Sequence, residues 1–585
     1  MAREVVNEHV RYEPEENPPP LIALGAGAQA AMLIVAPVVL TVVIVVRIAD
    51  ASDSYLTWGV FAAMLVCGIS TVLQAARVGR IGSGHVLIMG TSGAFIAVCV
   101  AALDLAGPAT LASLVVISSL FQFLLAARLS LLRRIFTPVV TGTVIMLIAV
   151  TVAPIIFGSL TDVPEGTDDM ATPLAAGVTL LVVGGMVLRA PSSLRLWSPI
   201  LGIAAGCAVG APFGLYDTGA IADAAWVGVP FRDWPGFDVT PGPEFWALLP
   251  AFIVVTLVGA IETIGDGVAI QRVSRRRPRA TDFRVVQGAL NADGVGNLLS
   301  GMAGTLPNTT YSTSISLAEV TGIGARRGGI IIGVIILALA FFPKFAALLI
   351  GIPSPVAAAY LLVLISLLFV QGMRIVVQDG VDHRKATVAG VAFWVGVGFQ
   401  SEMIFADLLG DGFLGILLGN GMTSGAIVAV AMMAFLELTG PRRRRLRVDA
   451  GDEALPRVSG FLREFATGAG WNAASAERLV LVGEETLASM ADGGEESATE
   501  DPRRLVVTAR SVGGAAELEF VSAAEGENIE DRLAYLGENP EITDGRDISF
   551  RLLRHLSSSV SHQKYHGVDV VAVRVAARQG GEDGG

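Results

Sequence analysis

The run FWALLPAFIVVTLVGAIETIGDGVAIQ occupies residues 245–271, and its only charged side chains are Glu262 and Asp266. A helix needs about 20 predominantly apolar residues to cross the hydrocarbon core of a bilayer, and this run is long enough. Charged groups are expensive at that depth and usually face a polar cavity or the interior of a helical bundle. The run therefore predicts a membrane span that carries two carboxyl groups on the inside of the protein.

Runs of the same kind recur on both sides of this one. We predict fourteen spans, and hence an all-α polytopic membrane protein, with approximate limits 21–46, 57–76, 84–104, 109–127, 136–158, 173–188, 197–215, 245–271, 285–303, 306–324, 328–349, 353–372, 386–408 and 412–438. The tenth span is the least apolar, because residues 308–316 are rich in Thr and Ser.

The charged residues divide the chain into parts of different composition. The whole chain is 53% hydrophobic and 16% charged, whereas soluble domains carry roughly 25% charged residues. Residues 1–20 contain 7 charged side chains, residues 21–440 contain 44, and residues 441–585 contain 43. This contrast excludes a single soluble globule and a disordered chain. It predicts an N-terminal tail (1–20), a membrane domain (21–440), a basic linker (441–449), a soluble domain (450–577) and a flexible tail (578–585).

Net charge and cysteine content add little about partners. The net charge of −12 lies mainly in the two ends of the chain, so we expect no nucleic-acid partner. Cys67, Cys99 and Cys207 all lie in apolar runs, and their spacing indicates neither a disulfide framework nor a metal site.

The basic residues predict the orientation in the membrane. If both termini are cytoplasmic, 18 of the 21 basic residues between 21 and 440 fall in cytoplasmic loops, and only Arg47, Arg232 and Lys344 fall elsewhere. Lys and Arg near the ends of spans favour the cytoplasmic side. The first apolar run lacks the basic segment that precedes it in a cleaved signal peptide. We therefore expect a multi-pass protein of the cytoplasmic membrane, with both termini inside.

Fourteen spans divide into seven and seven, and two pairs of counterparts look alike. Spans five and twelve both begin with a proline in the first turn, Pro138 and Pro355, and spans three and ten both open with Gly- or Pro-broken stretches. Interrupted segments at matching positions of two halves indicate the binding site of an inverted-repeat transporter. The alternative is that Gly and Pro are simply common in membrane helices.

Glu262 and Asp266 are four residues apart, so they share one face of the predicted helix. Intramembrane carboxyl groups are functional by default, and a close pair is suited to carry a proton. The structural alternative is that one of them caps a broken helix or accepts from backbone amides.

Span ten predicts a break within the membrane. Asn308–Tyr311 has the residue content of an extended segment, and a half-helix would follow with its N-terminus at the site. Backbone that leaves the helix at membrane depth must face protein or a wet cavity. Hydroxyls at 312, 313, 314 and 316 and the positive helix end would suit a flat polar ligand, neutral or weakly acidic. Glu319, further along, is interpreted as a vestibular or structural group.

Seven motifs across about 420 residues resemble the nucleobase–cation symporter family 2, the nucleobase–ascorbate or xanthine/uracil permeases. They are Gly79–Gly84, Gly90–Ser92, Thr137–Val144, Glu262–Asp266, Ala292–Gly294, Pro307–Tyr311 and Thr321–Gly322. The resemblance implies a core domain (about 21–127 and 245–349), a gate domain (about 136–215 and 353–438), proton-coupled transport of uracil, xanthine or urate-like bases, and a homodimer. No cofactor is implied other than the coupling ion, and the chain would not be an enzyme.

The resemblance also implies roles for single residues. Glu262 matches the glutamate that binds the base, and Asp266 matches a position linked to proton coupling. Further substrate contacts would come from Thr91, Ser92, Gly93, Thr313, Ser314 and Ser316, and structural support from Gln29, Asp293, Asn308 and Tyr311.

The span-ten contacts depart from the family pattern. Where the family has Gln or Glu, then Asn, then Gly, this chain has Thr313, Ser314 and Ser316. Span one has Gln29-Ala30 for the family's Gln-His pair, and Gly93 replaces an aromatic residue. A different or larger polar or anionic solute is therefore an open alternative.

The soluble domain is expected to be an α/β sandwich. Apolar spacing predicts helices near 455–467, 475–491 and 547–559, and strands near 503–511, 515–522 and 568–576. This order resembles the GHKL ATPase fold of anti-sigma-factor kinases, in which Glu485 matches the general base and Ser489 takes the place of the magnesium-binding Asn. The nucleotide loop at 522–526 lacks its Asp, and glycines are replaced at 547–552. These changes argue against ATP binding and favour a regulatory domain that contacts a cytoplasmic protein.

Three functions are compatible with these features. The first is a secondary transporter in the lipid bilayer for a nucleobase-like solute, coupled to protons or another cation. The second is a membrane sensor that signals ligand occupancy through the C-terminal domain. The third, a membrane-tethered kinase, is opposed by the altered nucleotide loop.

Overall fold

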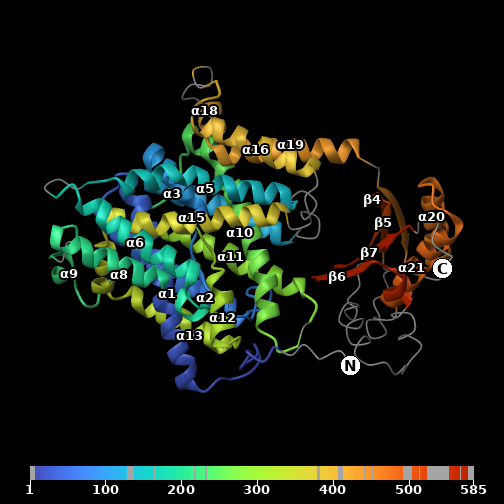
Figure 1. Ribbon diagram of the computed structural model, residues 1–585, viewed down its shortest axis with the longest axis horizontal. Coiled ribbons are helices and arrows are strands. Elements are labelled where there is room, and N and C mark those ends of the chain that lie inside the picture. The colour runs from blue at the N-terminus through green and yellow to red at the C-terminus, as the bar shows by residue number, and fades with distance from the viewer. Residues whose placement is uncertain are drawn as a thin grey trace. The chain divides into compact units, whose positions relative to one another are not determined.

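The computed structural model describes residues 7–127, 137–163, 167–216, 219–230, 234–277, 279–377, 383–405, 407, 413–440, 443–449, 453–491, 504–512, 514–522, 552–566 and 568–577. The chain separates into two compact units (Figure 1). The membrane unit comprises residues 7–276 and 285–433, and the second unit comprises residues 1–6, 277–284 and 434–585.

The membrane unit is built from apolar helices. In chain order the main ones are α1 (Pro20–Ile48), α2 (Asp53–Ala76), α3 (Ile96–Ala127), α5 (Pro138–Leu160), α6 (Ala171–Arg189), α8 (Ser198–Gly210), α10 (Pro243–Val273), α11 (Phe283–Ala303), α12 (Thr313–Thr321), α13 (Arg326–Ala340), α14 (Pro343–Ile350), α15 (Ser354–Val377), α16 (His383–Gln400), α18 (Phe413–Gly419) and α19 (Gly421–Thr439). Short helices lie at α7 (Ser192–Arg195), η2 (Ala211–Phe213) and α9 (Gly219–Asp223).

Within the described residues, eight helices are long and apolar enough to cross a bilayer, and nine if the pair α13–α14, bent by 86°, counts as one. The other predicted spans fall on shorter or more polar helices, so the count of fourteen stays a prediction. The helical part of predicted span three and all of span four lie in one element, α3, which is broken at Gly107 (φ 82°, ψ 177°) before Pro108. Proline cannot donate the backbone hydrogen bond that a continuous helix needs there.

Glycines bring two pairs of helices into backbone contact. A Cβ on Gly68 of α2 would lie 2.8 Å from the carbonyl oxygen of Gly333 on α13, and one on Gly333 would lie 2.7 Å from that of Gly68. The same reciprocal contact joins α5 to α15, where the distances are 2.5 Å from Gly142 and 2.7 Å from Gly372. Figure 1 shows α5 and α15 side by side. Small residues permit such close packing in membranes, where the lipid provides little hydrophobic drive for helix association.

Two short strands pair at the centre of the membrane unit. β1 (Met89–Thr91) and β2 (Asn308–Thr310) are antiparallel, with Gly90 opposite Thr309. β1 leads into the 3-10 turn η1 (Gly93–Phe95) and α3, and β2 leads into α12. The predicted extended stretch followed by a half-helix in span ten is therefore confirmed, and span three has the same form.

Residues 7–16 of the N-terminal tail form a strap that contacts the ends of α10 and α12. Arg11 and Tyr12 donate backbone hydrogen bonds to the Gly322 oxygen at the end of α12. Arg276, just beyond α10, makes a two-pronged ion pair with Glu16 at 2.8 and 2.7 Å. The strap thus joins the ends of α10 and α12.

The second unit holds a five-stranded antiparallel sheet in the order β3-β4-β5-β7-β6. Its strands are β3 (Arg444–Asp449), β4 (Arg504–Val512), β5 (Ala515–Ser522), β6 (Ser559–Tyr565) and β7 (Val568–Ala576). Alternate residues of the sheet, such as Val507 and Phe520, form one apolar core with Leu462 of α20 (Ala454–Gly468) and Leu479 of α21 (Ala473–Ala491). The two layers agree with the predicted α/β sandwich.

Two segments of this unit differ from expectation. The segment predicted as a basic linker is strand β3 over Arg444–Asp449, because Leu446 and Val448 alternate with arginines and Val448 is buried. The helix predicted over 547–559 is present over 552–556 among the described residues, but it ends earlier than predicted, because β6 begins at Ser559. The nucleotide-loop positions 523–526 and 547–551, and the tail 578–585, lie outside the described residues.

Candidate functional site

The paired strands position the residues that were predicted to form the site. Gly82 and Gly84 precede β1 with φ angles of 97° and 73°, which glycine adopts without the strain that a Cβ would cause. Gly82 N–H donates to the Gly288 oxygen of α11, and this bond fixes the approach to β1. The strands are held to each other and to α1, since Tyr311 donates from its hydroxyl to the Thr91 oxygen and the Thr91 hydroxyl donates to Val38.

Asp266 lies behind the second strand and is buried. It accepts hydrogen bonds from the hydroxyls of Thr310, at 2.7 Å, and Ser312, at 2.8 Å. These two donors come from β2 and from the residue that precedes α12, so they link α10 to the break in span ten. The hydroxyl-rich composition of span ten is explained in part by this pairing.

A second carboxyl group, Asp293 on α11, is fully buried in a polar network. It accepts from Gln122 at 2.5 Å and from Thr263 at 2.7 Å. Asn297 donates to Gln122, and its own oxygen accepts from the backbone N–H of Asn308 at 2.8 Å. The network therefore holds the first residue of β2. Gln122, Thr263 and Asn297 were not predicted as site residues, and their only sequence signal is a polar side chain within an apolar run.

A cavity of about 200 Å³ opens beside the strands. One wall is polar and is formed by Thr41, Thr91, Ser92, Gly93, Glu262, Thr309, Ser312 and Thr313, with Pro37, Ala94 and Tyr311. The facing wall comes from α15 and is largely apolar: Tyr360, Leu361, Leu364, Leu367 and Leu368, with Gln371. Sequence reasoning missed the α15 wall, because leucines in a membrane helix carry no sign of which face meets a ligand.

Glu262 is the one carboxyl group among the residues that line this cavity. No hydrogen bond to its side chain forms within the described part of the chain, whereas both Asp266 and Asp293 are held by hydroxyl or amide donors. Glu262 is therefore available to accept from a ligand. Ser92 also lines the cavity, and its buried hydroxyl has no partner within the described residues.

The remaining predicted residues lie elsewhere. Ser314 is buried and accepts from the Ile88 N–H at 2.9 Å, so it supports β1 instead of facing the cavity. Ser316 and Gln29 are half-buried and do not line the cavity. Asn308 and Asp293 lie behind it, in the polar network.

The arrangement suits reversible binding of a small polar solute. Two helical segments, η1 and α12, begin at the cavity, and the N-terminus of a helix carries partial positive charge. A carboxylate acceptor, several hydroxyls and an apolar wall would hold a flat molecule by its edge and its faces. Among the described residues, no group of three or more His, Cys, Asp or Glu is arranged to hold a metal ion.

Comparison with known proteins gives matches over the same region. A family model described as "Permease family" matches residues 22–403. The chain is similar to the xanthine permease XanP of Escherichia coli (strain K12), with 24% identity over 449 residues that cover 73% of this chain and 94% of that protein. It is also similar to the nucleobase transporter PlUacP of Paenibacillus larvae, with 27% identity over 65% of this chain and 86% of that protein.

Among solved structures, the transmembrane domain of a cyanobacterium bicarbonate transporter, BicA, is similar with 16% identity and a TM-score of 0.46, over 72% of this chain and 100% of that chain.

Proposed function

The chain belongs to the permease family, and from that membership we propose that it carries a nucleobase of the xanthine, uracil or urate kind across the cytoplasmic membrane. It is a multi-pass membrane transporter and not an enzyme. The observation that carries the substrate proposal is Glu262, a carboxyl group without an internal hydrogen-bond partner in the described structure, on the polar wall of the cavity. A carboxylate accepts hydrogen bonds from ring N–H groups, and the hydroxyls beside it can donate hydrogen bonds to the carbonyl oxygens of a base.

We further propose that transport is coupled to protons. Asp266 lies one helical turn from Glu262, and its two hydroxyl donors belong to the segment that would move with α12. Two carboxyl groups that close favour the binding of one proton between them. In this scheme Glu262 binds the base and Asp266 takes up and releases the coupling proton.

Several finer features belong to the same proposal. They are fourteen spans in a seven-plus-seven inverted repeat, core and gate domains, both termini in the cytoplasm, and a homodimer. The domain after α19 would regulate transport through a cytoplasmic protein, without binding ATP.

Uptake into proteoliposomes tests the proposal. With an inward proton gradient we expect accumulation of labelled xanthine, uracil or urate by the parent protein. Glu262→Gln should reduce binding and uptake at least about tenfold, because an amide cannot replace the charged acceptor. Glu319→Gln is the matched control, since Glu319 lies on α12, is exposed and is absent from the cavity lining. Unchanged uptake in Glu262→Gln would contradict the assignment of the binding residue.

Proton coupling has a separate test. Asp266→Asn should keep exchange of labelled for unlabelled base and lose accumulation driven by the gradient. Loss of both activities, or of neither, would contradict the proposed division between the two carboxyl groups.

A different solute is the second candidate, and Thr313, Ser314 and Ser316 favour it because they replace the family's amide or carboxyl contacts. Thermal-shift screening against bases, nucleosides and small carboxylates separates the two. If Thr313→Gln raises xanthine affinity, the departure at residue 313 determines the substrate.

A sensor function is distinguished by deleting residues 441–585. Normal uptake with altered signalling would favour a regulated transporter, and no uptake in either form would favour a sensor.

A further inference from the structure

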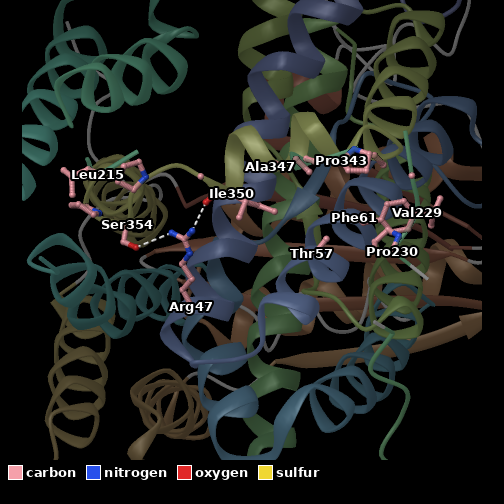
Figure 2. A pocket seen from close by; sticks show the side chains of 17 residues that line it. Arg47, Thr57, Phe61, Leu215, Val229, Pro230, Pro343, Ala347, Ile350 and Ser354 are labelled. Carbon is pink, nitrogen blue, oxygen red and sulfur yellow. Dashed lines mark hydrogen bonds between the residues drawn. The ribbon is translucent and has the colours of Figure 1, made fainter. Parts of the chain in front are cut away.

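The membrane unit contains a larger cavity of about 650 Å³ (Figure 2), distinct from the one at Glu262. Its walls are mostly apolar and come from α2, α14, Leu215, the segment 224–230 and the start of α15, with Phe61, Val229, Pro343 and Ile350 among the lining residues. Arg47, at the end of α1, is the one charged residue in its lining. Arg47 is also one of the three basic residues of the membrane domain that fall outside the predicted cytoplasmic loops.

The two cavities follow one another along the same pair of helices. Both are lined by α1 and α15: the site cavity by Thr41 and Tyr360, and the larger cavity by Arg47 and Pro355. Because an α-helix rises 1.5 Å per residue, the cavities are about 9 Å apart along α1 and about 8 Å apart along α15. They are therefore neighbouring compartments along α1 and α15.

An apolar layer separates the compartments. On α1 the intervening residues 42–46 are all Val or Ile and are at most 3% exposed. On α15 the intervening residues 356–359 are Val and Ala and are at most 1% exposed. A polar solute cannot cross this layer without losing its hydrogen bonds, which is costly, so the layer blocks passage between the two cavities in this structure.

Arg47 ties the helices together at the far edge of that layer. Its guanidinium donates to the Ile350 oxygen at 2.8 Å, to the Ile352 oxygen at 3.4 Å and to the Ser354 hydroxyl at 3.5 Å. Figure 2 shows the bonds to Ile350 and Ser354. The carbonyls at the end of α14 lack helical partners and carry partial negative charge, so an arginine is well suited to hold them. Asp53 and Asp162 are the acidic groups whose charges act on Arg47.

We propose that Arg47 is the outer latch of this transporter. It holds the outer ends of α1, α14 and α15 together, and its bonds to the Ile350–Ser354 segment must break before solute in the 650 Å³ cavity can reach Glu262. The larger cavity is then the outer vestibule, which takes a planar heteroaromatic solute against its apolar walls before the route opens. Arg47 is a positioning residue for transport and does not bind solute in the central site. This proposal rests on the proposed transport function and on the orientation with both termini inside.

Accessibility of the central cavity tests the latch. A single cysteine at Leu364, on the α15 wall, is introduced after replacing Cys67, Cys99 and Cys207 with Ser, Ala and Ala. A membrane-impermeant maleimide is then applied from the outside to right-side-out vesicles. Arg47→Ala should raise the labelling rate about tenfold, because the bonds that favour the closed route are gone. Arg47→Lys should give a smaller rise, since an ammonium group cannot reproduce the planar array of donors.

Lys344→Ala provides the matched control. Lys344 is the neighbouring outer cation and contacts Trp226 and the Ala222 oxygen, but it bonds neither α1 nor α15. Its replacement should change labelling less than about twofold, because no latch contact is lost.

Equal labelling of Arg47→Ala, Lys344→Ala and the parent would overturn the proposal. So would a rise seen only with reagent applied from the cytoplasmic side. If Arg47→Ala does not fold, judged by its melting curve, Arg47→Lys carries the test, and labelling at the parent rate then refutes the latch. The assay needs no solute, so a failed latch and a failed nucleobase assignment give different results.

Discussion

The two broken spans differ in what they contribute to the site, although their outlines match. β1 is followed by a turn and the first part of α3, which breaks at Gly107 and continues as a second helix, whereas β2 is followed by α12, which ends at Gly322 after nine residues. The first strand packs closely through Gly90, while the second carries Thr309 at the paired position. Hydroxyls after β2 hold Asp266, and the corresponding Ser92 after β1 has no partner in the described residues.

This difference indicates a division of labour. The β1 half presents backbone and one unpaired hydroxyl to the cavity, so it forms a fixed surface. The β2 half is connected through side chains to Asp266 and to the Asp293 network, and through the backbone oxygen of Gly322 to the N-terminal strap. A change of protonation or of strap binding would therefore reach the cavity through β2.

Removing Asp293 should loosen the β2 half most strongly. Asp293→Ala leaves Gln122 and Thr263 without their acceptor, and an unsatisfied buried polar group costs about 1–3 kcal/mol. We expect a loss of roughly 2–5 kcal/mol in stability and no transport, measured by thermal unfolding of the purified protein and by uptake. Asn291→Ala, also on α11 but bonded only to the Arg80 oxygen near the surface, should have little effect. Similar melting curves for the two variants would contradict the role of the network.

Gly90→Ala, in the β1 half, should destabilise the protein more than Thr309→Ala, at the paired position of β2. The added Cβ would lie 2.6 Å from the Tyr311 ring and 2.9 Å from Val38, so Tyr311 must move and weaken its bond to Thr91. Overpacking of this kind costs about 1–3 kcal/mol. Thr309→Ala loses two long contacts, one of 3.4 Å to the Gly259 oxygen and one of 3.3 Å to the Thr263 hydroxyl, and should cost less than about 1 kcal/mol. Equal destabilisation in thermal unfolding would show that the strands are interchangeable.

Ser312 and Ser92 occupy matching positions before their helices and should separate stability from binding. Ser312→Ala removes a 2.8 Å bond to Asp266, so it should destabilise the protein by about 1–2 kcal/mol. Ser92→Ala should leave the melting temperature unchanged and weaken solute binding about fivefold to tenfold, because its hydroxyl is free for the ligand. Calorimetric titration with the transported base measures the second effect. The reverse pattern would exclude Ser92 as a ligand contact.

The strap should give the smallest effect, confined to the β2 half. The Arg276 guanidinium holds the pKa of Glu16 below its usual value of 4.5. A lowered pKa means that the pair stabilises the strap above pH 4.5 and that this contribution fades as the pH falls further. Glu16→Gln at neutral pH should increase hydrogen exchange of residues 7–16 by less than about threefold, since the pair is partly exposed. Glu8→Gln is the control, and protection that stays constant as the pH is lowered from 7 to well below 4.5 would contradict the ion-pair account.

The sequence predicted the membrane unit and the breaks better than it predicted the site. Apolar length predicts a helix such as α10 directly, and Pro307 with the Thr-rich stretch after it predicts β2 and α12. Glu262 and Asp266 stood out because a carboxyl group in an apolar run is costly. Spacing alone could not show that Asp266 turns toward Thr310 and Ser312 while Glu262 faces the cavity, since both lie on one helical face.

Other parts of the site depend on contacts between distant segments. Leu364 and Leu368 of α15 look like any lipid-facing leucine until the fold brings them opposite β1. Ser314 was expected to contact the substrate, but its hydroxyl meets Ile88, more than two hundred positions earlier in the chain. In the second unit, Arg444–Asp449 looked like a linker because its arginines dominate the composition, although alternate residues fit a sheet edge.

The reciprocal glycine contacts of α2 with α13 and of α5 with α15 have a mechanical consequence. Backbone touching backbone leaves no side-chain rotamers to adjust, so each pair resists shear and behaves as a stiff block. Between the blocks, the cavity is bordered by the leucine side chains of α15, which can change rotamer at little cost. Movement of one helix pair relative to the other should therefore occur mainly at the leucine surface of α15, and the helices themselves need not bend.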